Sequence, residues 1–139
     1  MLPHFLVIGG MKCGTTALWH YLRRHPDIWV PQKNVEFFVS EKWSNGPSWY
    51  ERFFEDAEAG SVVGEVSSEY AKHPYRADAP GRIREVLPNV RLVYLVRHPI
   101  ERAVSHYCHM VNYGTERRGA REALLAEDNN QYLAFSMYN

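Results

Sequence analysis

The chain has 139 residues, 45% of them hydrophobic, and its 16 Lys and Arg residues balance its 16 Asp and Glu residues to a formal net charge of zero. This composition fits one domain over residues 1–139 with a real core. It argues against a broad nucleic-acid-binding surface, which needs an excess of positive charge. The sequence contains no run of about 18 apolar residues, so it predicts no membrane-spanning helix. Because no signal-peptide pattern precedes the first strand, we expect a cytoplasmic protein.

The predicted elements alternate between strands and helices along the chain. In order, they are a strand at 4–9, a helix at 15–24, strand 28–30, loop 41–49, helix 49–58, strand 61–66, helix 80–87, strand 90–96, a helix from residue 99 and a helix at 119–134. This alternation predicts an α/β fold with a parallel sheet flanked by helices. The nearly all-apolar strand 90–96 is typical of a parallel strand covered on both faces. Ligands of such sheets bind at the carboxyl ends of strands, so Lys12 and Arg97 are expected at the same edge.

The most specific motif lies between the first strand and the first helix. An apolar run ends at Gly9-Gly10, and Lys12-Cys13-Gly14-Thr15-Thr16 precedes the helical pattern that starts at Ala17. A glycine-rich turn before a helix directs backbone N–H groups and the positive end of the helix dipole toward one point, which suits a phosphate. The alternative is an ordinary turn whose glycines serve packing only.

The order of residues in this loop differs from that of the common nucleoside-triphosphate loop. That loop, G-x-x-x-x-G-K-[ST], has its lysine after the second glycine, whereas here Lys12 precedes Gly14. The strand at 90–96 ends in Arg97-His98-Pro99, with no aspartate at its tip to hold Mg²⁺. Cys13 and Cys108 show neither a disulfide framework nor metal-ligand spacing. The sequence therefore predicts a phosphate-binding loop that works without a metal, and no metal site.

Two stretches of the chain resemble a known family. GGMKCGTTAL resembles the 5′-phosphosulfate loop of sulfotransferases that use 3′-phosphoadenosine 5′-phosphosulfate (PAPS). LVYLVRHPIERAVSHY resembles their 3′-phosphate motif, in which an arginine ends a strand and a serine follows on a helix, and Arg97 and Ser105 have that spacing. The chain is most similar to the heparan-sulfate branch (N-deacetylase/N-sulfotransferase and 3-O-sulfotransferase) and its bacterial relatives. The resemblance implies a P-loop-like nucleotide-binding fold.

The resemblance also implies a reaction and a set of contacts. PAPS would be the cosubstrate, and a hydroxyl or amine compound, expected to be a carbohydrate, would accept the sulfuryl group. Lys12 would stabilise the charge that builds on the leaving phosphate oxygen, and Arg97 and Ser105 would hold the 3′-phosphate. The alternatives are a solvated lysine, a surface arginine and a helix-packing serine. The remaining cradle would come from the loop residues Gly10, Met11, Cys13, Gly14, Thr15 and Thr16.

Two glutamates are candidates for the base that takes the acceptor's proton. Family members usually carry K-E-x-x-F-F, but this chain reads Lys33-Asn34-Val35-Glu36-Phe37-Phe38, and asparagine cannot act as a base. In an extended segment, residues 34 and 36 point to the same side, so Glu36 is the first candidate. Glu65, at the end of the strand 61–66, is the second. The alternatives are that Glu36 is a surface charge and that Glu65 makes a structural hydrogen bond that orients Lys12 or the loop.

Family members generally run longer, and their further part carries a glycine-rich basic loop that helps to close over the 3′-phosphate and adenine. We therefore expect residues 1–139 to be the N-terminal portion of a sulfotransferase domain, as a fragment, a truncated chain or a shortened gene product. A domain trimmed from a eukaryotic protein would place it in the Golgi lumen instead. Three other functions stay open: a P-loop kinase or NTPase, a module that binds PAPS or its product without turnover, and a structural α/β fragment without a ligand.

Overall fold

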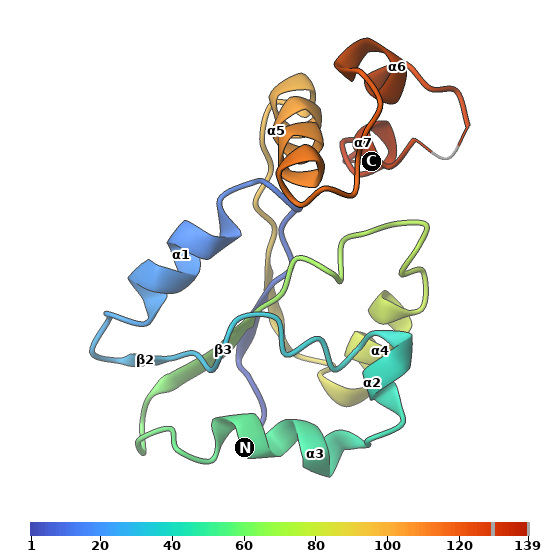
Figure 1. Cartoon of the computed structure of the whole chain (residues 1–139). Helices are drawn as coiled ribbons and strands as arrows, with labels where there is room; N and C mark the ends of the chain where they lie inside the picture. Colours follow the sequence, from blue (N-terminus) through green and yellow to red (C-terminus); the bar gives the residue numbers. More distant parts are fainter. Residues whose placement is uncertain (129, 139) are drawn as a thin grey trace.

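The computed structural model describes residues 1–128 and 130–138, and within them four parallel strands form a sheet in the order β2-β3-β1-β4 (Figure 1). The central strand β1 pairs with both β3 and β4, so that Leu6 lies opposite Glu65 on one side and Leu92 on the other. A parallel sheet with flanking helices confirms the predicted fold class. The strands are β1 Phe5–Val7, β2 Ile28–Trp29, β3 Val62–Val66 and β4 Arg91–Val93.

The helices gather in separate groups around the sheet. In Figure 1, α5, α6 and α7 lie together at the top of the view, α2, α3 and α4 lie at the bottom, and α1 lies to one side. Prolines stand in the first turns of α3, α4 and α5, where the missing N–H costs no helical hydrogen bond. The helices are α1 Thr15–Leu22, α2 Ser40–Trp43, α3 Pro47–Glu51, the 3₁₀ helix η1 Arg52–Phe54, α4 Ala79–Val86, α5 Pro99–Asn112, α6 Ala120–Leu124 and α7 Gln131–Ala134.

Two helices expected from the sequence are interrupted. The helix expected over 119–134 is two short helices, α6 and α7. The side chain of Asn130 separates them: it donates to the carbonyls of Leu124 and Ala126 and accepts from the N–H of Leu133. Asparagine competes in this way with the helical backbone for hydrogen bonds. The helix expected over 49–58 is likewise shorter, consisting of α3 and η1.

The main core is aromatic and lies on the side of β2, β3 and β1. Phe37 stacks on Tyr50 with ring centroids 4.7 Å apart, and Phe38 and Phe54 meet the same tyrosine edge to face. At the other edge, β4 departs from the prediction of a strand covered on both faces, because Leu92 is 54% exposed. The reason is that β4 is the last strand of the described sheet and that α5 to α7 gather beyond its end rather than over it (Figure 1).

A close backbone approach joins the ends of β1 and β4. The N–H of Gly10 donates to the carbonyl of Leu95 at 3.0 Å, and a side chain at Gly9 would come within 2.7 Å of Leu95. Glycine is therefore required sterically at position 9. This approach brings the loop after β1 next to the loop after β4. Among the described helices, none is long and apolar enough to span a membrane.

Candidate functional site

Segments that follow all four strands, together with α5, line one cavity of about 600 Å³. The cavity brings together Lys12, Arg97 and Ser105, which the sequence assigned to two different anion sites. A parallel sheet explains the convergence, because the carboxyl ends of its strands share one edge. The lining residues are Met11, Lys12, Gly14, Thr15, Thr16, Lys33, Asn34, Ser68, Glu69, Lys72, Arg97, Ser105, His109 and Tyr113.

The loop after β1 forms one wall of the cavity. Its backbone turns through left-handed conformations at Lys12 (φ 69°) and Gly14 (φ 92°). Gly14 then precedes α1, and its carbonyl accepts the N–H of Leu18 at 3.1 Å. The first N–H groups of a helix have no carbonyl partner within it. Those at the start of α1, which follows the loop directly, can therefore donate to an anion.

Two of the predicted loop residues, Gly10 and Cys13, do not line the cavity. The N–H of Gly10 donates a hydrogen bond to the carbonyl of Leu95, just after β4, and the carbonyl of Gly10 accepts the N–H of Cys13 at 3.1 Å. The Cys13 thiol lies 3.6 Å from the hydroxyl of Tyr138 and 3.8 Å from the carbonyl of Met11. These contacts stabilise the conformation of the loop without lining the cavity.

Arg97 and Ser105 line the cavity from the segment after β4 and from α5. Arg97 follows β4, and its side chain is 43% exposed and pairs with Glu101 at 3.1 Å. The backbone N–H of Arg97 donates to the Tyr138 hydroxyl at 3.4 Å, so this tyrosine contacts both the β4 loop and Cys13. Ser105 lies on the second turn of α5. The guanidinium thus lies at the surface of the cavity. An anion could replace its solvent-exposed partner, Glu101.

A second arginine, Arg102, is fully buried behind the phosphate loop. Its guanidinium donates to Ser136 at 2.6 Å, to the carbonyl of Tyr132 and, at 3.5 Å, to the carbonyl of Met11. It also lies 3.5 Å from Nδ1 of His106. Burial and the neighbouring Arg102 charge lower the pKa of His106 to about 4. Arg102 therefore ties α5 to α7 and to the wall of the cavity.

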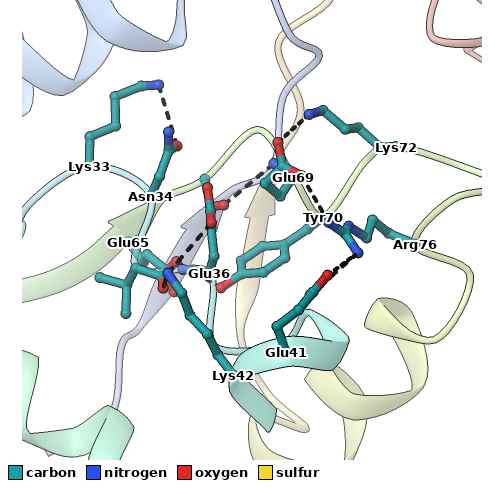
Figure 2. Close-up of polar contacts among 12 residues, drawn as sticks. Lys33, Asn34, Glu36, Glu41, Lys42, Glu65, Glu69, Tyr70, Lys72 and Arg76 are labelled. Atoms are coloured by element: carbon teal, nitrogen blue, oxygen red, sulfur yellow. Dashed lines mark hydrogen bonds and ion pairs between the residues drawn. The ribbon is translucent and has the colours of Figure 1, made fainter. Parts of the chain in front are cut away.

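Glu65 lies in the core rather than at the edge of the cavity where the sequence placed it. It is fully buried, and both its oxygens are occupied. Oε1 accepts the Tyr70 hydroxyl at 2.7 Å and the Glu36 backbone N–H at 3.1 Å (Figure 2). Oε2 accepts the Tyr50 hydroxyl. Burial raises the pKa of the carboxyl, although the three hydrogen-bond donors act to lower it. Its hydrogen bond orients the segment around Glu36, and it makes none to Lys12.

The segment after β2 is not extended, which separates residues 34 and 36. Both Asn34 and Glu36 have φ 62°. Asn34 lines the cavity and its amide oxygen accepts from Lys33 at 3.4 Å. The Glu36 side chain instead pairs with Lys42 on α2 at 3.5 Å and does not line the cavity (Figure 2). The expectation that the two side chains point to the same side is therefore wrong.

Several cavity residues received no role from the sequence. Ser68, Glu69 and Lys72 follow β3, and the rule that ligands bind beyond strand ends could have identified them. His109 and Tyr113 continue the face of α5 from Ser105 at intervals of four residues. Lys33 is a further cavity residue of this kind. Burial lowers the pKa of its ammonium group, and the carboxylates of Glu36 and Glu69 raise this pKa by a smaller amount.

The charge of the cavity is predominantly positive. Four cationic side chains line it, whereas Glu69 is the one carboxylate among its described lining residues; the cations are Lys12, Lys33, Lys72 and Arg97. Such a surface suits a ligand with several negative charges. Within residues 1–128 and 130–138, no three or more His, Cys, Asp and Glu side chains are grouped to hold a metal ion.

Comparisons with known proteins agree with the family resemblance of the chain. The model of the sulfotransferase family matches residues 35–136. The chain is 38% identical over 109 residues to the membrane-associated sulfotransferase kil1 of Dictyostelium discoideum, covering 76% of this chain and 22% of that protein. It is 32% identical over 105 residues to human heparan sulfate glucosamine 3-O-sulfotransferase 6, covering 76% of this chain and 30% of that one.

A solved structure shows the same fold. The crystal structure of a sulfotransferase from Alicyclobacillus acidocaldarius superposes with a TM-score of 0.79 at 28% identity, over 98% of this chain and 64% of that chain. The chain thus spans less than a third of these two curated relatives and under two thirds of this structural neighbour. The matches confirm the family resemblance that the phosphate loop and the Arg97 motif carry.

Proposed function

Since the chain belongs to the sulfotransferase family, we propose that it transfers a sulfuryl group from PAPS to a hydroxyl or amine group of a carbohydrate. The observation that carries this proposal is one cavity lined both by the Lys12 loop and by Arg97 and Ser105, the two groups of residues that we expect to bind anions. PAPS carries a phosphosulfate on the 5′ side of its ribose and a phosphate on the 3′ side. A donor of this shape can contact both sites at once.

The residues of the cavity suit the groups of the donor. The N–H groups at the start of α1, the Lys12 ammonium and the hydroxyls of Thr15 and Thr16 would hold the phosphosulfate. Arg97 would bind the 3′-phosphate, because a guanidinium matches phosphate with two parallel hydrogen bonds. The Ser105 hydroxyl would add a further donor from α5. Lys33 and Lys72 supply additional positive charge on the remaining wall.

The chemistry needs a cation at the leaving oxygen. The acceptor atom forms a bond to sulfur, the bond between sulfur and the 5′-phosphate oxygen breaks, and the electron pair stays on that oxygen. Lys12 and the loop amides would stabilise this charge, which exists only partly in the bound donor. Lys12 should therefore act mainly on the transition state, and Arg97 on the ground state and the transition state alike.

Two rival functions lead to different expectations. A P-loop kinase or NTPase would need Mg²⁺, but the loop places Lys12 before Gly14, and Arg97-His98-Pro99 follows β4 where a metal-holding aspartate would stand. A module that binds the donor without turnover is favoured by one observation, the amide of Asn34 where the family carries a carboxylate. Nucleotide preference separates the first rival from our proposal, and turnover separates the second.

Calorimetry with adenosine 3′,5′-bisphosphate tests the proposal. We expect binding that is unchanged by a chelator and stronger than that of ATP. Arg97→Ala should weaken it by about 1.5–3 kcal/mol, the value of a charge-assisted hydrogen bond. Arg84→Ala, an exposed arginine on α4, is the matched control and should leave binding unchanged. Lys12→Ala should lower turnover more than it lowers bisphosphate binding. Binding that requires Mg²⁺, or an Arg97→Ala chain with full affinity, would contradict the proposal.

A further inference from the structure

Sulfuryl transfer requires a group that takes the acceptor's proton, and neither glutamate chosen from the sequence lines the cavity. Glu69 does line it, on the turn that follows β3. We propose that Glu69 is the general base of this site, an assignment that rests on the proposed function. It would serve in place of the carboxylate that the family carries where this chain has Asn34.

The other carboxylates near the site are occupied elsewhere. Glu65 is fully buried and accepts hydrogen bonds from two tyrosines and a backbone N–H. Glu36 turns toward Lys42 on α2. Glu101 pairs with Arg97 and does not line the cavity. Among the described residues that line the cavity, Glu69 alone has an oxygen that can accept a proton from a bound hydroxyl or amine as a carboxylate.

Two cationic side chains hold the Glu69 carboxylate in position. One oxygen pairs with Lys72, and the other lies 3.6 Å from Arg76 (Figure 2). The backbone N–H of Glu69 donates to the Ser67 hydroxyl at 3.4 Å, which fixes the turn after β3. The side chain keeps 18% of its surface exposed, so it is neither sealed in the core like Glu65 nor free in solvent.

The reaction itself makes the acceptor's proton easy to remove. As the acceptor oxygen or nitrogen bonds to sulfur, it becomes positively charged and its proton becomes strongly acidic. A weak base at the correct position is then sufficient. In this reaction the acceptor's O–H or N–H proton moves to Glu69, and the acceptor atom gains the sulfuryl group. The 5′-phosphate oxygen keeps the electron pair of the broken bond to sulfur, beside Lys12.

The test compares Glu69→Gln with wild type and with Glu85→Gln, an exposed glutamate on α4 that serves as the matched control. The probes are PAPS with an oligosaccharide bearing free hydroxyl and amine groups, and PAPS with p-nitrophenol. We expect Glu69→Gln to lower kcat by about 10²- to 10⁴-fold and to remove the acid limb of the pH profile of kcat/KM. The affinity for adenosine 3′,5′-bisphosphate should stay equal or rise, since one negative charge leaves the cavity.

A merely structural role for Glu69 predicts a different pattern. Loss of the partner of Lys72 and Arg76 would lower thermal stability and donor affinity and leave the pH profile intact. As a further check, Asn34→Glu in the Glu69→Gln background places a carboxylate on the cavity wall again, and it should restore part of kcat. Full activity of Glu69→Gln, or a Glu36→Gln variant that loses activity instead, would overturn the assignment. A wild-type chain that binds no bisphosphate, or transfers no sulfuryl group to either probe, would contradict the proposed function itself.

Discussion

Two buried polar clusters support loops near the cavity; one is centred on an acidic side chain and the other on a basic side chain. The first is centred on Glu65 and holds the backbone N–H of Glu36, in the segment after β2. The second is centred on Arg102 and holds the carbonyl of Met11, in the loop after β1. Both central residues are fully buried. The anion is surrounded by O–H and N–H donors, and the cation by carbonyl and hydroxyl acceptors.

This difference shows how the fold fixes site loops whose backbone is irregular. Neither charge has an opposite charge among the hydrogen-bond partners that the described residues provide, so each one attracts backbone and hydroxyl dipoles instead. A buried charge is tolerated only when its hydrogen bonds are complete. Each cluster therefore favours one conformation of the loop that completes it. The two clusters should differ in pH response, because one contains a carboxyl with a raised pKa and the other an imidazole with a lowered pKa.

The largest expected effect comes from removal of the buried cation. Arg102→Gln loses charged donors to Ser136, Tyr132 and Met11, and hydrogen bonds to charged groups contribute about 1.5–3 kcal/mol each. We expect the free energy of unfolding to fall by at least about 3 kcal/mol in urea titrations. Arg102→Lys keeps the charge with fewer donors and should lose less. Equal stability of Arg102→Gln and the exposed-site variant Arg121→Gln would show that this cluster does not support the fold.

Acid should destabilise the Arg102 cluster through His106. The folded pKa of about 4 lies below the ordinary value of 6.5, so the unfolded chain binds more protons between these two values. The free energy of unfolding should therefore fall as the pH drops from about 6.5 toward 4, by up to about 3 kcal/mol from this group. Besides Arg102, the nearby charges that oppose protonation are Lys72, His109 and Lys12. His106→Gln should flatten this part of a pH-stability curve, and an unchanged slope would contradict the assignment.

The Glu65 cluster should show the opposite slope. Its folded pKa is raised above the ordinary value of 4.5, so the folded state binds more protons. The stability that protonated Glu65 contributes is fully present below about pH 4.5 and is lost as the pH rises through the folded pKa. Glu65→Gln offers one carbonyl oxygen to two tyrosine hydroxyls. It should cost about 1–3 kcal/mol at acid pH, and less as the pH rises. A cost that grows with pH would mean that the ionised form is the favoured one.

The phosphate-loop elements could be predicted because their signals are local. A strand, a glycine-rich turn and a helix start follow each other within residues 5–18, and the cavity contains Lys12, Gly14 and both threonines as expected. Arg97 and Ser105 could be placed because parallel strands bring their carboxyl ends to one edge. The approach of β1 and β4 at Gly9, which brings the two loops together, is a tertiary contact that the sequence alone does not show.

The carboxylates could not be placed correctly, for two physical reasons. β3 is buried on both faces over Val63–Val66, so the alternation of side chains along the strand did not reveal that Glu65 points into a tyrosine-lined core. Asn34 and Glu36 both have positive φ angles; asparagine adopts such angles more often than other non-glycine residues, but glutamate gives no warning of one. Glu69 lies just beyond the end of β3, where the strand-end rule applies, but the orientation of its side chain depends on the turn and on ion pairs with residues later in the chain.

The smallest expected effect concerns the exposed arginine, which contrasts with the buried one five residues later. Arg97 pairs with Glu101 one helical turn away, and the two side chains are 43% and 62% exposed. Solvent screens such a pair, so Glu101→Gln should change the free energy of unfolding by at most about 0.5 kcal/mol. Because the substitution frees the guanidinium and removes a negative charge beside the site that we propose for the 3′-phosphate, affinity for adenosine 3′,5′-bisphosphate should stay equal or rise, most visibly in low salt. Calorimetry at two salt concentrations measures both effects. If affinity falls instead, Glu101 orients Arg97 toward the ligand, and the contrast between a buried arginine that supports the loop and an exposed one that binds freely would have to be revised.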